Sequence, residues 1–378
     1  MPSFAKRAAA AAALVVAIVV ANAMLSEEGL FGFGVPRYWA HVLMLAGVNV
    51  ILAVSLNLIN GFTGQFSIGH AGFMAIGAYS SAYLTVYHAQ AWERSLGGAV
   101  GETAAGVVVF LLAILVGAVV SGLAGLVVGV PSLRLRGDYL AIVTLGFAEI
   151  IRIVILNMDV VGGATGFTVP GETNFLWVGS FAVITILVVH NIVRSDTGRA
   201  LISIREDELA AEAMGINSTR YKVLSFVIGS MFAGIAGALF GHYTKFLSTN
   251  DFTFLRSFEI IIMIVLGGMG SITGSVLGAV VITILPEFLR QLPAVGGYNL
   301  ADLRLVIYSA LLILIMLTRP QGVLGEREFG FNWLRRAQKR PEGDEAVGAG
   351  GGVPIDERPA RTVANEAGGD AAGGGEKR

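Results

Sequence analysis

Long apolar runs separated by short polar segments make up most of the chain. A helix needs about 20 residues to cross the hydrocarbon core of a bilayer. Runs near or above that length lie at Ala8–Leu25, Tyr38–Asn60, Gly64–Tyr87, Ala104–Val130, Asp138–Asn157, Phe175–Val193 and Lys222–Tyr243, followed by a close pair over Phe258–Leu289 that breaks near Gly267–Gly270 and by Leu303–Leu317. A transmembrane barrel would show shorter, alternating segments. We therefore expect an all-α membrane protein, a polytopic helical bundle of about 10 transmembrane segments with Gly-broken helices.

Composition agrees with that class and divides the chain into three parts. The 378 residues are 54% hydrophobic and 14% charged, which excludes a soluble globule. We expect an N-terminal transmembrane segment and external loop at 1–37, a transmembrane domain at 38–325 and a tail at 326–378. From Pro341 to Arg378 the tail has almost no large apolar residue. Such a segment cannot offset the entropy of ordering, so we expect a cytoplasmic, mostly disordered tail.

Lys and Arg residues predict the orientation, because they accumulate on the cytoplasmic side of a membrane. Under the topology above, one face carries more of them: Lys6, Arg7, Arg134, Arg136, Arg194, Arg199, Arg205, Arg220, Lys222 and Arg319. Both termini are then cytoplasmic. The start of the chain also fits a signal peptide, with Lys6 and Arg7 before an apolar run and Ala21-Asn22-Ala23 as a cleavage site. In either case the run Tyr38–Asn60 enters the membrane from outside.

A dense island of charge lies between two apolar runs, from Gly198 to Gly215, and reads GRALISIREDELAAEAMG. The part Arg205–Met214 can form a short helix with apolar residues on one side and acidic residues on much of the rest. Gly215 supplies a left-handed stop, and Asn217 or Ser218 can cap the next helix. We expect a cytoplasmic helix parallel to the membrane, suited to receiving a push from a soluble partner. The alternative is an interfacial helix resting on headgroups, but such helices usually carry Lys and Arg.

Glycine interrupts two apolar regions in opposite halves of the chain. The first interruption runs from Gly61 to Gly72 and contains Gly64, Gln65, Ser67 and His70; the second runs from Gly267 to Gly274. Glycine-broken segments in corresponding halves indicate a binding site made from discontinuous helices. Tight helix packing also explains closely spaced glycines. The sequence leaves both interpretations of the interruptions open.

Glu149 and Arg152 are the clearest ionisable residues inside a predicted span. Charges there are costly and usually face a bundle interior or a wet cavity. The two residues are three apart on one helix, so they can neutralise each other. Alternatively they present opposite charges to a zwitterion on a substrate path, where Gly64, Gln65, Ser67 and His70 would contribute the break and hydrogen bonds.

Several kinds of chemistry have no motif in this chain. There is no Gly-Lys dipeptide and hence no phosphate-binding P-loop, and neither a Gly-x-Ser-x-Gly elbow nor a His-Glu-x-x-His helix occurs. There is no cysteine, and the five histidines have no ligand-like spacing. We expect a protein that is not an enzyme, with no catalytic residue, cofactor, metal site or nucleic-acid partner.

Three segments carry a resemblance to a known family over about Tyr38 to Gly325. They read NLINGFTGQFSIGHAGFMAIGAY from Asn57, RGDYLAIVTLGFAEIIRIV from Arg136 and GRALISIREDELAAEAMGINSTRYK from Gly198, and the exit Thr318-Arg-Pro-Gln-Gly322 matches as well. With these motifs the chain resembles the LivM/LivH permeases of ABC importers for branched-chain amino acids, most closely the LivM type. The glycine-rich tail departs from the family pattern, and the resemblance assigns it no role.

The resemblance implies a machine of several subunits in the bacterial cytoplasmic (inner) membrane. Its further parts would be a second, LivH-like permease, two ATPase subunits and a periplasmic substrate-binding protein, with ATP hydrolysis on the ATPases. The docking segment for the ATPase would contain Arg205, Glu206, Asp207, Glu208, Glu212, Ala213 and Gly215. Related permeases carry urea, short amides or aromatic acids, which leaves those substrates as alternatives. An ion-coupled secondary transporter is a further alternative, but it would normally show a buried carboxylate without a nearby cation.

Overall fold

The computed structural model describes residues 36–132 and 137–291, together with 306, 310, 313 and 322. All of them belong to one compact unit, Met1–Phe329. The predicted first span with its signal-peptide alternative, most of the predicted last span and the whole tail from 326 onward lie outside the described residues.

The described elements are almost all helical. In chain order they are α2 (Arg37–Asn57), a π-helical turn (Leu58–Phe62), α3 (His70–Tyr87), α4 (Ala89–Val100), α5 (Glu102–Ser132), α6 (Asp138–Leu156), the short strand β1 (Phe167–Thr168), α7 (Phe175–Arg194), α8 (Asp196–Glu206), α9 (Glu208–Ala213), α10 (Ser218–Thr244), β2 (Phe246–Leu247), α11 (Phe254–Gly267) and α12 (Ile272–Gln291). Single turns of 3-10 helix lie at Asp159–Val161, Gly163–Thr165 and Thr249–Phe252.

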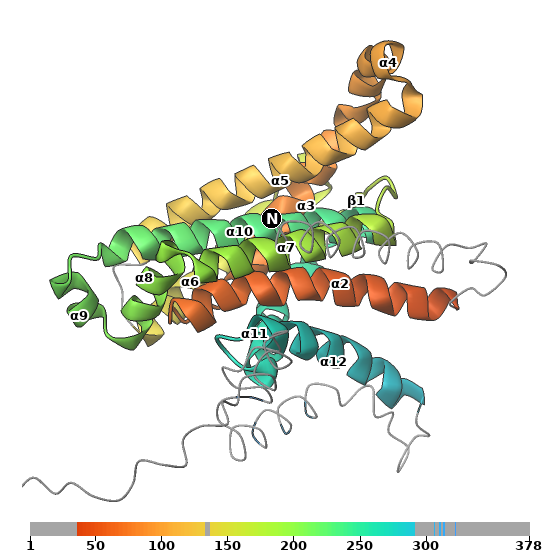
Figure 1. The fold of residues 1–378 in the computed structure, drawn as a ribbon. Helices are drawn as coiled ribbons and strands as arrows, with labels where there is room; N and C mark the ends of the chain where they lie inside the picture. The colour runs from red at the N-terminus through yellow and green to blue at the C-terminus, as the bar shows by residue number, and fades with distance from the viewer. Residues whose placement is uncertain are drawn as a thin grey trace, which may run out of the picture. The chain divides into compact units, whose positions relative to one another are not determined.

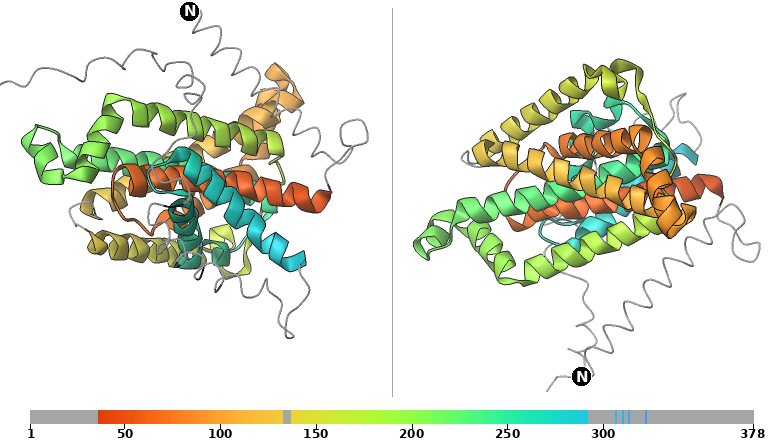
Figure 2. Two further views of the ribbon diagram at one scale, coloured as in Figure 1. Left: turned by 60° about the horizontal axis from the view of Figure 1, so that its bottom comes forward. Right: turned by 90° about the horizontal axis from the view of Figure 1, so that it is seen from above.

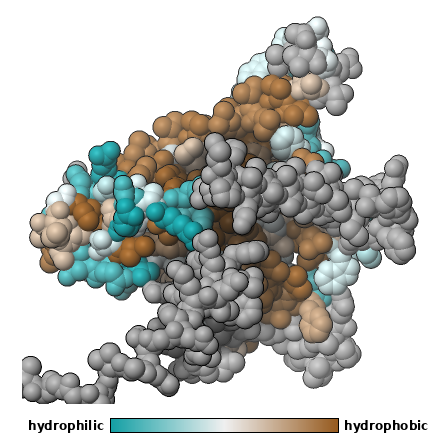
Figure 3. Space-filling view, viewed as in Figure 1, coloured by the Kyte–Doolittle hydropathy of each residue, from teal (hydrophilic) through white to brown (hydrophobic). Residues whose placement is uncertain are grey.

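The long helices lie side by side, with the connecting segments at their two ends (Figure 1). Helices α8 and α9 form one end, and α4 and β1 lie at the other, which the two further views also show (Figure 2). Among the described residues, five segments are long and apolar enough to span a membrane: Arg37–Phe62, Ala104–Ser132, Asp138–Leu156, Phe175–Arg194 and Ser218–Thr244. Brown apolar surface covers the middle of the molecule, and teal polar surface gathers at the α8–α9 end (Figure 3). The chain is an all-α polytopic membrane protein, as predicted.

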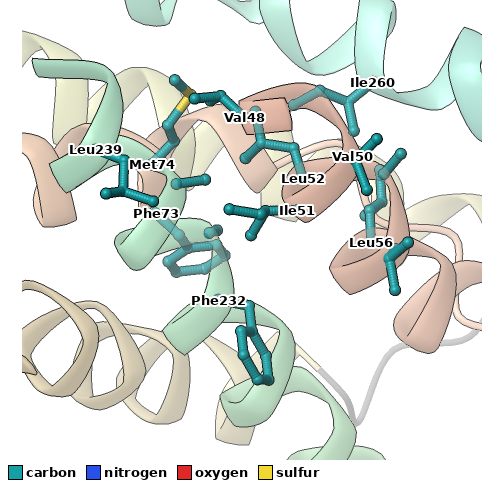
Figure 4. Close-up of a cluster of buried hydrophobic side chains, with 14 of the residues drawn as sticks. Val48, Val50, Ile51, Leu52, Leu56, Phe73, Met74, Phe232, Leu239 and Ile260 are labelled. Carbon is teal, nitrogen blue, oxygen red and sulfur yellow. The ribbon is translucent and has the colours of Figure 1, made fainter. Parts of the chain in front are cut away.

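Helix α2 is the central helix of the described bundle. In its most apolar stretch 83% of the residues are buried, compared with 28% for α6 and 22% for α7. Its side chains Val48, Ile51 and Leu52 meet Phe73 and others from α3 and α10 in one apolar cluster (Figure 4). Helices that are apolar all round and buried all round form the interior of a bundle, whereas α6 and α7 keep one face for lipid.

Glycines allow α3, α5 and α10 to touch backbone to backbone. A Cβ atom added to Gly77 of α3 would overlap the backbone of Gly234 in α10, and one added to Gly234 would lie 2.7 Å from the Gly117 oxygen of α5. Gly237 likewise packs on the backbone of Met74. Because lipid gives no hydrophobic drive for helix association, such close approach is how helices pack in membranes.

The charged segment differs from its predicted form. The helix expected over Arg205–Met214 is two helices, α8 and α9, which meet at Asp207 in an extended conformation (φ −156°, ψ 109°). The Asp207 carboxylate accepts hydrogen bonds from the backbone N–H groups of Leu209 (2.9 Å) and Ala210 (3.0 Å). A short acidic side chain that caps a new helix also ends the previous one. The predicted stop at Gly215 (φ +84°) and the cap at Asn217, which accepts from Arg220 N–H at 3.0 Å, are both present.

Candidate functional site

The first predicted glycine interruption is a real break in the helical path. After the π-helical turn Leu58–Phe62 the chain is irregular until α3 begins at His70, so the span predicted from Gly64 starts six residues late. Gly64 has a positive φ of +72°. The Asn60 side chain holds the returning chain through both of its polar atoms, since its Oδ1 accepts from Ser67 N–H and its Nδ2 donates to Ser67 O, each at 3.2 Å.

Side chains from three other helices hold the start of α3. His70 Nε2 lies 2.9 Å from Ser55 Oγ of α2. Thr144 of α6 accepts from Ile68 N–H at 3.1 Å, and Ser257 of α11 accepts from Ala71 N–H at 3.1 Å. Backbone donors at a helix start have no partner within their own helix, and here hydroxyl groups take that role.

The polar residues of this break are buried inside the chain. Gln65, Ser67 and His70 are 4%, 1% and 1% exposed. Neither polar atom of the Gln65 side chain has a hydrogen-bond partner among the described residues, and neither has His70 Nδ1. A buried amide without partners is costly. The break is therefore a polar region that the surrounding helices enclose.

The second predicted interruption is also present, and it lies against the first. Helix α11 ends at Gly267 and α12 begins at Ile272. The side chain of Asn57 joins the two breaks, because its Oδ1 accepts from Gly270 N–H at 2.9 Å and its Nδ2 donates to Ser271 O at 3.0 Å. A Cβ at Gly61 would overlap Gly270 N, so the backbones of the two breaks are in contact.

Glu149 and Arg152 form the mutual pair that their spacing allows. Arg152 Nε donates to Glu149 Oε2 at 2.7 Å, and the two side chains are 22% and 26% exposed. The other oxygen, Glu149 Oε1, accepts from the backbone N–H of Phe254 at 3.2 Å, the first residue of α11. Glu149 therefore also stabilises a helix start, where a negative charge is favourable. It lies five residues beyond Thr144 on α6, about 7.5 Å along the axis, so α6 contacts α11 between one and two turns beyond its contact with the first break.

A second partly buried charged cluster surrounds Arg256 and was not predicted from the sequence. Arg256 pairs with Glu259 at 2.9 Å, with both side chains 19% exposed, and its Nη2 donates to Asn49 Oδ1 at 2.6 Å. Asn49 Nδ2 in turn donates to Thr283 Oγ1 at 2.7 Å. The apolar pair predicted from the sequence begins at Phe258, whereas α11 begins at Phe254 and therefore includes Arg256. The spacing of three between Arg256 and Glu259 at the start of an apolar run was the available signal.

The acidic residues of α9 contact their own chain. Glu208 pairs with Lys222 of α10 at 2.6 Å, and Glu212 accepts from Ser218 Oγ. Leu209 of α9 and Met214, the residue directly after α9, face solvent and are 65% and 83% exposed. The α8–α9 end therefore has an exposed apolar surface, and the ion pair between Glu208 and Lys222 fixes it to α10.

The remaining predicted docking residues occupy two kinds of position. Ala213 and Gly215 are exposed beside Met214, and Glu206 is 67% exposed at its side chain. Arg205 turns the other way: its side chain is 23% exposed and contacts the first glycine break. Arg205 therefore packs against Gly64 in the first break, and its side chain points away from the exposed residues Leu209 and Met214.

No described residues offer a metal centre, since no group of three or more His, Cys, Asp or Glu lies together in ranges 36–132 and 137–291. A crevice of about 840 Å³ between α3, α5 and α6 is lined mainly by apolar side chains such as Ile76, Val120 and Ile151. That lining suits a lipid tail better than a zwitterion, which needs charged or hydrogen-bonding partners.

Comparison with known proteins supports the assignment of the fold. Residues 38–316 match the family model described as branched-chain amino acid transport system / permease component. The chain is 33% identical over 328 residues to the high-affinity branched-chain amino acid transport system permease protein LivM of Salmonella typhimurium, covering 77% of this chain and 71% of the relative. It is 26% identical to the probable LivM of Methanocaldococcus jannaschii, covering 76% and 93%.

A shorter match links the chain to the other permease type. Over 171 residues it is 32% identical to LivH of Salmonella typhimurium, which covers 45% of this chain and 53% of that relative. No solved structure matches the chain significantly. The match to the family model includes both glycine breaks and the α8–α9 segment. On the family model and the LivM relatives together, the chain belongs to the branched-chain amino acid transport permeases, as a LivM-type permease subunit.

Proposed function

We propose that this chain is the LivM-type permease of an ATP-driven ABC importer that moves branched-chain amino acids across the bacterial inner membrane. A periplasmic binding protein would deliver the amino acid, a LivH-like permease would form the other half of the pathway, and two ATPase subunits would supply the energy. The names of the LivM and LivH relatives support the substrate class and the second permease.

The structure of the α8–α9 end is the observation that supports docking of the ATPase subunits to this chain. Leu209 and Met214 stand exposed at a tip that Glu208 and Lys222 fasten to α10. Exposed apolar side chains surrounded by polar residues are typical of protein interaction sites. A rigid connection between that tip and a spanning helix passes a displacement of the tip into the membrane. This end carries Arg194, Arg199, Arg205, Arg220 and Lys222, which favours the cytoplasmic side.

The substrate part rests on the enclosed polar region. Gln65, Ser67 and His70 at the first break, with Glu149 and Arg152 nearby on α6, supply hydrogen-bonding and charged groups within a mostly apolar bundle. We assign these residues and Gly64 to the substrate path. Because the three break residues are buried in this conformation, the path opens only when the helices around the break separate.

The docking surface is tested by placing a charge on the exposed tip. The transporter is purified through a tag on this chain, and the co-purified ATPase is quantified for Leu209→Asp and Met214→Asp. Burying a carboxylate in an apolar contact should reduce ATPase recovery at least tenfold. The matched control is Val160→Asp, an exposed apolar residue (54%) at the α4 end. Equal recovery for all three variants would remove α9 from the interface.

Substrate and energy source are tested in proteoliposomes that contain the same purified complex, with the periplasmic binding protein added on the side from which the amino acid is taken up. Uptake of radiolabelled L-leucine should require ATP, stop with vanadate and be unaffected by collapse of the ion gradient. Uptake driven by an ion gradient without ATP would show a secondary transporter instead. Transport of urea, a short amide or an aromatic acid without leucine would keep the importer and change its substrate.

A further inference from the structure

Arg205 reaches from the last turn of α8 into the first glycine break. Its Nη1 donates a hydrogen bond to the backbone oxygen of Gly61 at 3.1 Å, a residue 144 positions earlier in the chain. On its other side the same guanidinium holds Glu206, with Nε at 3.1 Å and Nη2 at 2.7 Å from Oε1. The side chain therefore contacts both its own helix end and the interior of the bundle.

The same side chain lies against both breaks. A Cβ added to Gly64 would lie 2.9 Å from Arg205 Cγ, and one added to Gly270 would lie 2.9 Å from Arg205 Nη1. The breaks are themselves joined by Asn57 through Gly270 N–H. Gly322 also packs here, since a Cβ on it would lie 2.5 Å from Gly268 Cα. The segments around Gly61 and Gly270 therefore meet at the Arg205 side chain, and Gly322 packs against the second of them.

Arginine has the chemistry that this position requires. The C-terminal carbonyl groups of a helix lack intrahelical partners and carry partial negative charge, which a cation stabilises. Gly61 O lies in the π-helical turn Leu58–Phe62, where the regular helix ends and the first break begins. Guanidinium offers five donors in a fixed plane, so one edge can serve Gly61 while another serves Glu206. A lysine ammonium carries the charge but cannot hold both groups in one plane.

We propose that Arg205 is a positioning residue through which movement of the α8–α9 end separates or closes the paired glycine breaks. Displacement of α8 carries Arg205 away from Gly61 and Gly270, so that the hydrogen bonds of Asn57 alone remain to join the two breaks. Arg205 then transmits the ATPase cycle to the membrane interior without being an ATPase contact itself. This inference rests on the proposed function and makes it specific to one side chain.

The test uses the complete transporter, purified through a tag on this chain and reconstituted in proteoliposomes. Arg205→Gln removes the charge and the planar set of guanidinium donors, whereas Arg205→Lys retains the charge alone. Arg199→Gln is the matched control, because Arg199 lies on the same helix with its side chain 72% exposed. For Arg205→Gln we expect ATPase recovery and basal ATP hydrolysis within twofold of the unmodified chain, and L-leucine uptake per ATP reduced at least tenfold. Leucine uptake per ATP for Arg205→Lys should lie between the values for Arg205→Gln and the unmodified chain. Arg199→Gln should match the unmodified chain.

A second measurement reports on the break directly. The chain has no cysteine, so a single Thr63→Cys substitution provides one thiol, at a position that is 2% exposed in the break. With Arg205 present, the rate of thiol labelling should differ at least fivefold between the nucleotide-free and the vanadate-trapped complex. With Arg205→Gln we expect the two rates to become equal, and with Arg205→Lys we expect a smaller difference between them than in the unmodified chain.

Each contrary outcome has a distinct meaning. Loss of the ATPase from the Arg205→Gln complex would make Arg205 a docking residue and overturn the inference. So would normal leucine uptake per ATP, or labelling at Thr63→Cys that still follows the nucleotide state in both variants. If Arg205→Gln fails to accumulate in the membrane, Arg205→Lys decides alone by the same measurements. Failure of the proposed function itself would appear in the unmodified chain, as absence of a co-purified ATPase or of ATP-driven leucine uptake.

Discussion

Lys222 Nζ lies 2.6 Å from the carboxylate of Glu208, although both residues belong to the polar end of the molecule. The Lys222 side chain is only 11% exposed, and that of Glu208 is 24% exposed. The pair therefore joins the short helix α9 to the first turns of α10 in surroundings with less water than an ordinary surface. It explains how a helix of six residues, too short to be stable by itself, keeps a defined position.

Breaking this pair should destabilise the α8–α9 end. We expect Glu208→Gln to lower the stability by about 1–3 kcal/mol, between the values typical of exposed and buried pairs. Thermal unfolding of the detergent-solubilised protein measures the change. The control is Asp196→Asn, which loses an exposed pair with Arg199 and should change stability by less than about 0.5 kcal/mol. A similar loss in both variants would mean that Glu208 acts as an ordinary surface charge.

The corner between α8 and α9 depends on Asp207. Asp207→Ala removes the acceptor of two backbone N–H groups and should cost about 1 kcal/mol, the usual value of an N-cap. Asp207→Asn retains an acceptor oxygen and should restore most of that loss. Hydrogen exchange at Leu209 and Ala210 N–H provides the readout, with faster exchange expected for Asp207→Ala alone. Unchanged exchange there would contradict the capping role.

Glu149 and Arg152 need a more careful test than exchange of their charges. A swapped arginine at position 149 cannot accept the N–H of Phe254, so the swap loses a contact even if no substrate is involved. Glu149→Gln retains an acceptor for Phe254 while removing the charge. If the pair is only mutual, Glu149→Gln with Arg152→Gln should transport L-leucine within about threefold of the unmodified chain, since no unpaired charge is left inside the bundle.

If the two charges address the substrate, the same neutral double variant should lose uptake at least tenfold while its membrane abundance stays normal. The Michaelis constant for the delivered amino acid is measured for the double variant together with its uptake rate. Single variants should be worse than the double variant only in the mutual case, because each leaves one charge uncompensated.

The Arg256 cluster should contribute mainly to stability. Arg256→Leu leaves Glu259 without its cation and Asn49 Oδ1 without its donor. We expect a loss of about 2–4 kcal/mol, near the range for breaking a partly buried pair. Glu259→Gln combined with Arg256→Gln should recover at least about 1 kcal/mol relative to the sum of the single variants. Strict additivity in thermal unfolding would show that the two residues do not interact.

Hydropathy predicted most of the described helices because a bilayer imposes a length and a composition on each crossing. The bounds of α5, α6 and α7 fall within two residues of the predicted runs. The length of the irregular stretch before His70 could not be predicted, because glycine and small polar residues occur both in helices and in loops within an apolar region. Helix α4 and the pairing of Phe167 with Leu247 were missed, because neither is apolar enough nor long enough to give a pattern.

The candidate site was predictable at the level of residues and not at the level of contacts. Spacing alone indicated that Glu149 and Arg152 can pair, and they do. It gave no access to Phe254, which lies 105 positions away, or to the contact of Arg205 with Gly61. The same holds for α9, whose acidic residues the sequence predicts to belong to a docking segment, but whose contact with Lys222 depends on a residue 14 positions beyond Glu208. Long-range partners such as Lys222 decide which side of a short helix faces outward, and periodicity does not contain them.

The crossing of α3 and α10 has a consequence for genetic selection. Substituting Gly77 by Ala should impair insertion or activity, because the added methyl group meets backbone atoms of Gly234 and not a side chain. Suppressors of a damaged packing contact usually arise when a neighbouring residue becomes smaller. Gly234 cannot become smaller, because glycine has no side chain. A screen for suppressors of Gly77→Ala should therefore return the original codon or changes at distant positions that tolerate a shifted helix. At Gly234, Ser121→Gly would remove one overlap, since Ser121 Cβ lies 2.6 Å from an added Cβ, but the backbone oxygen of Gly117 would still lie 2.7 Å away, so the same result is expected there.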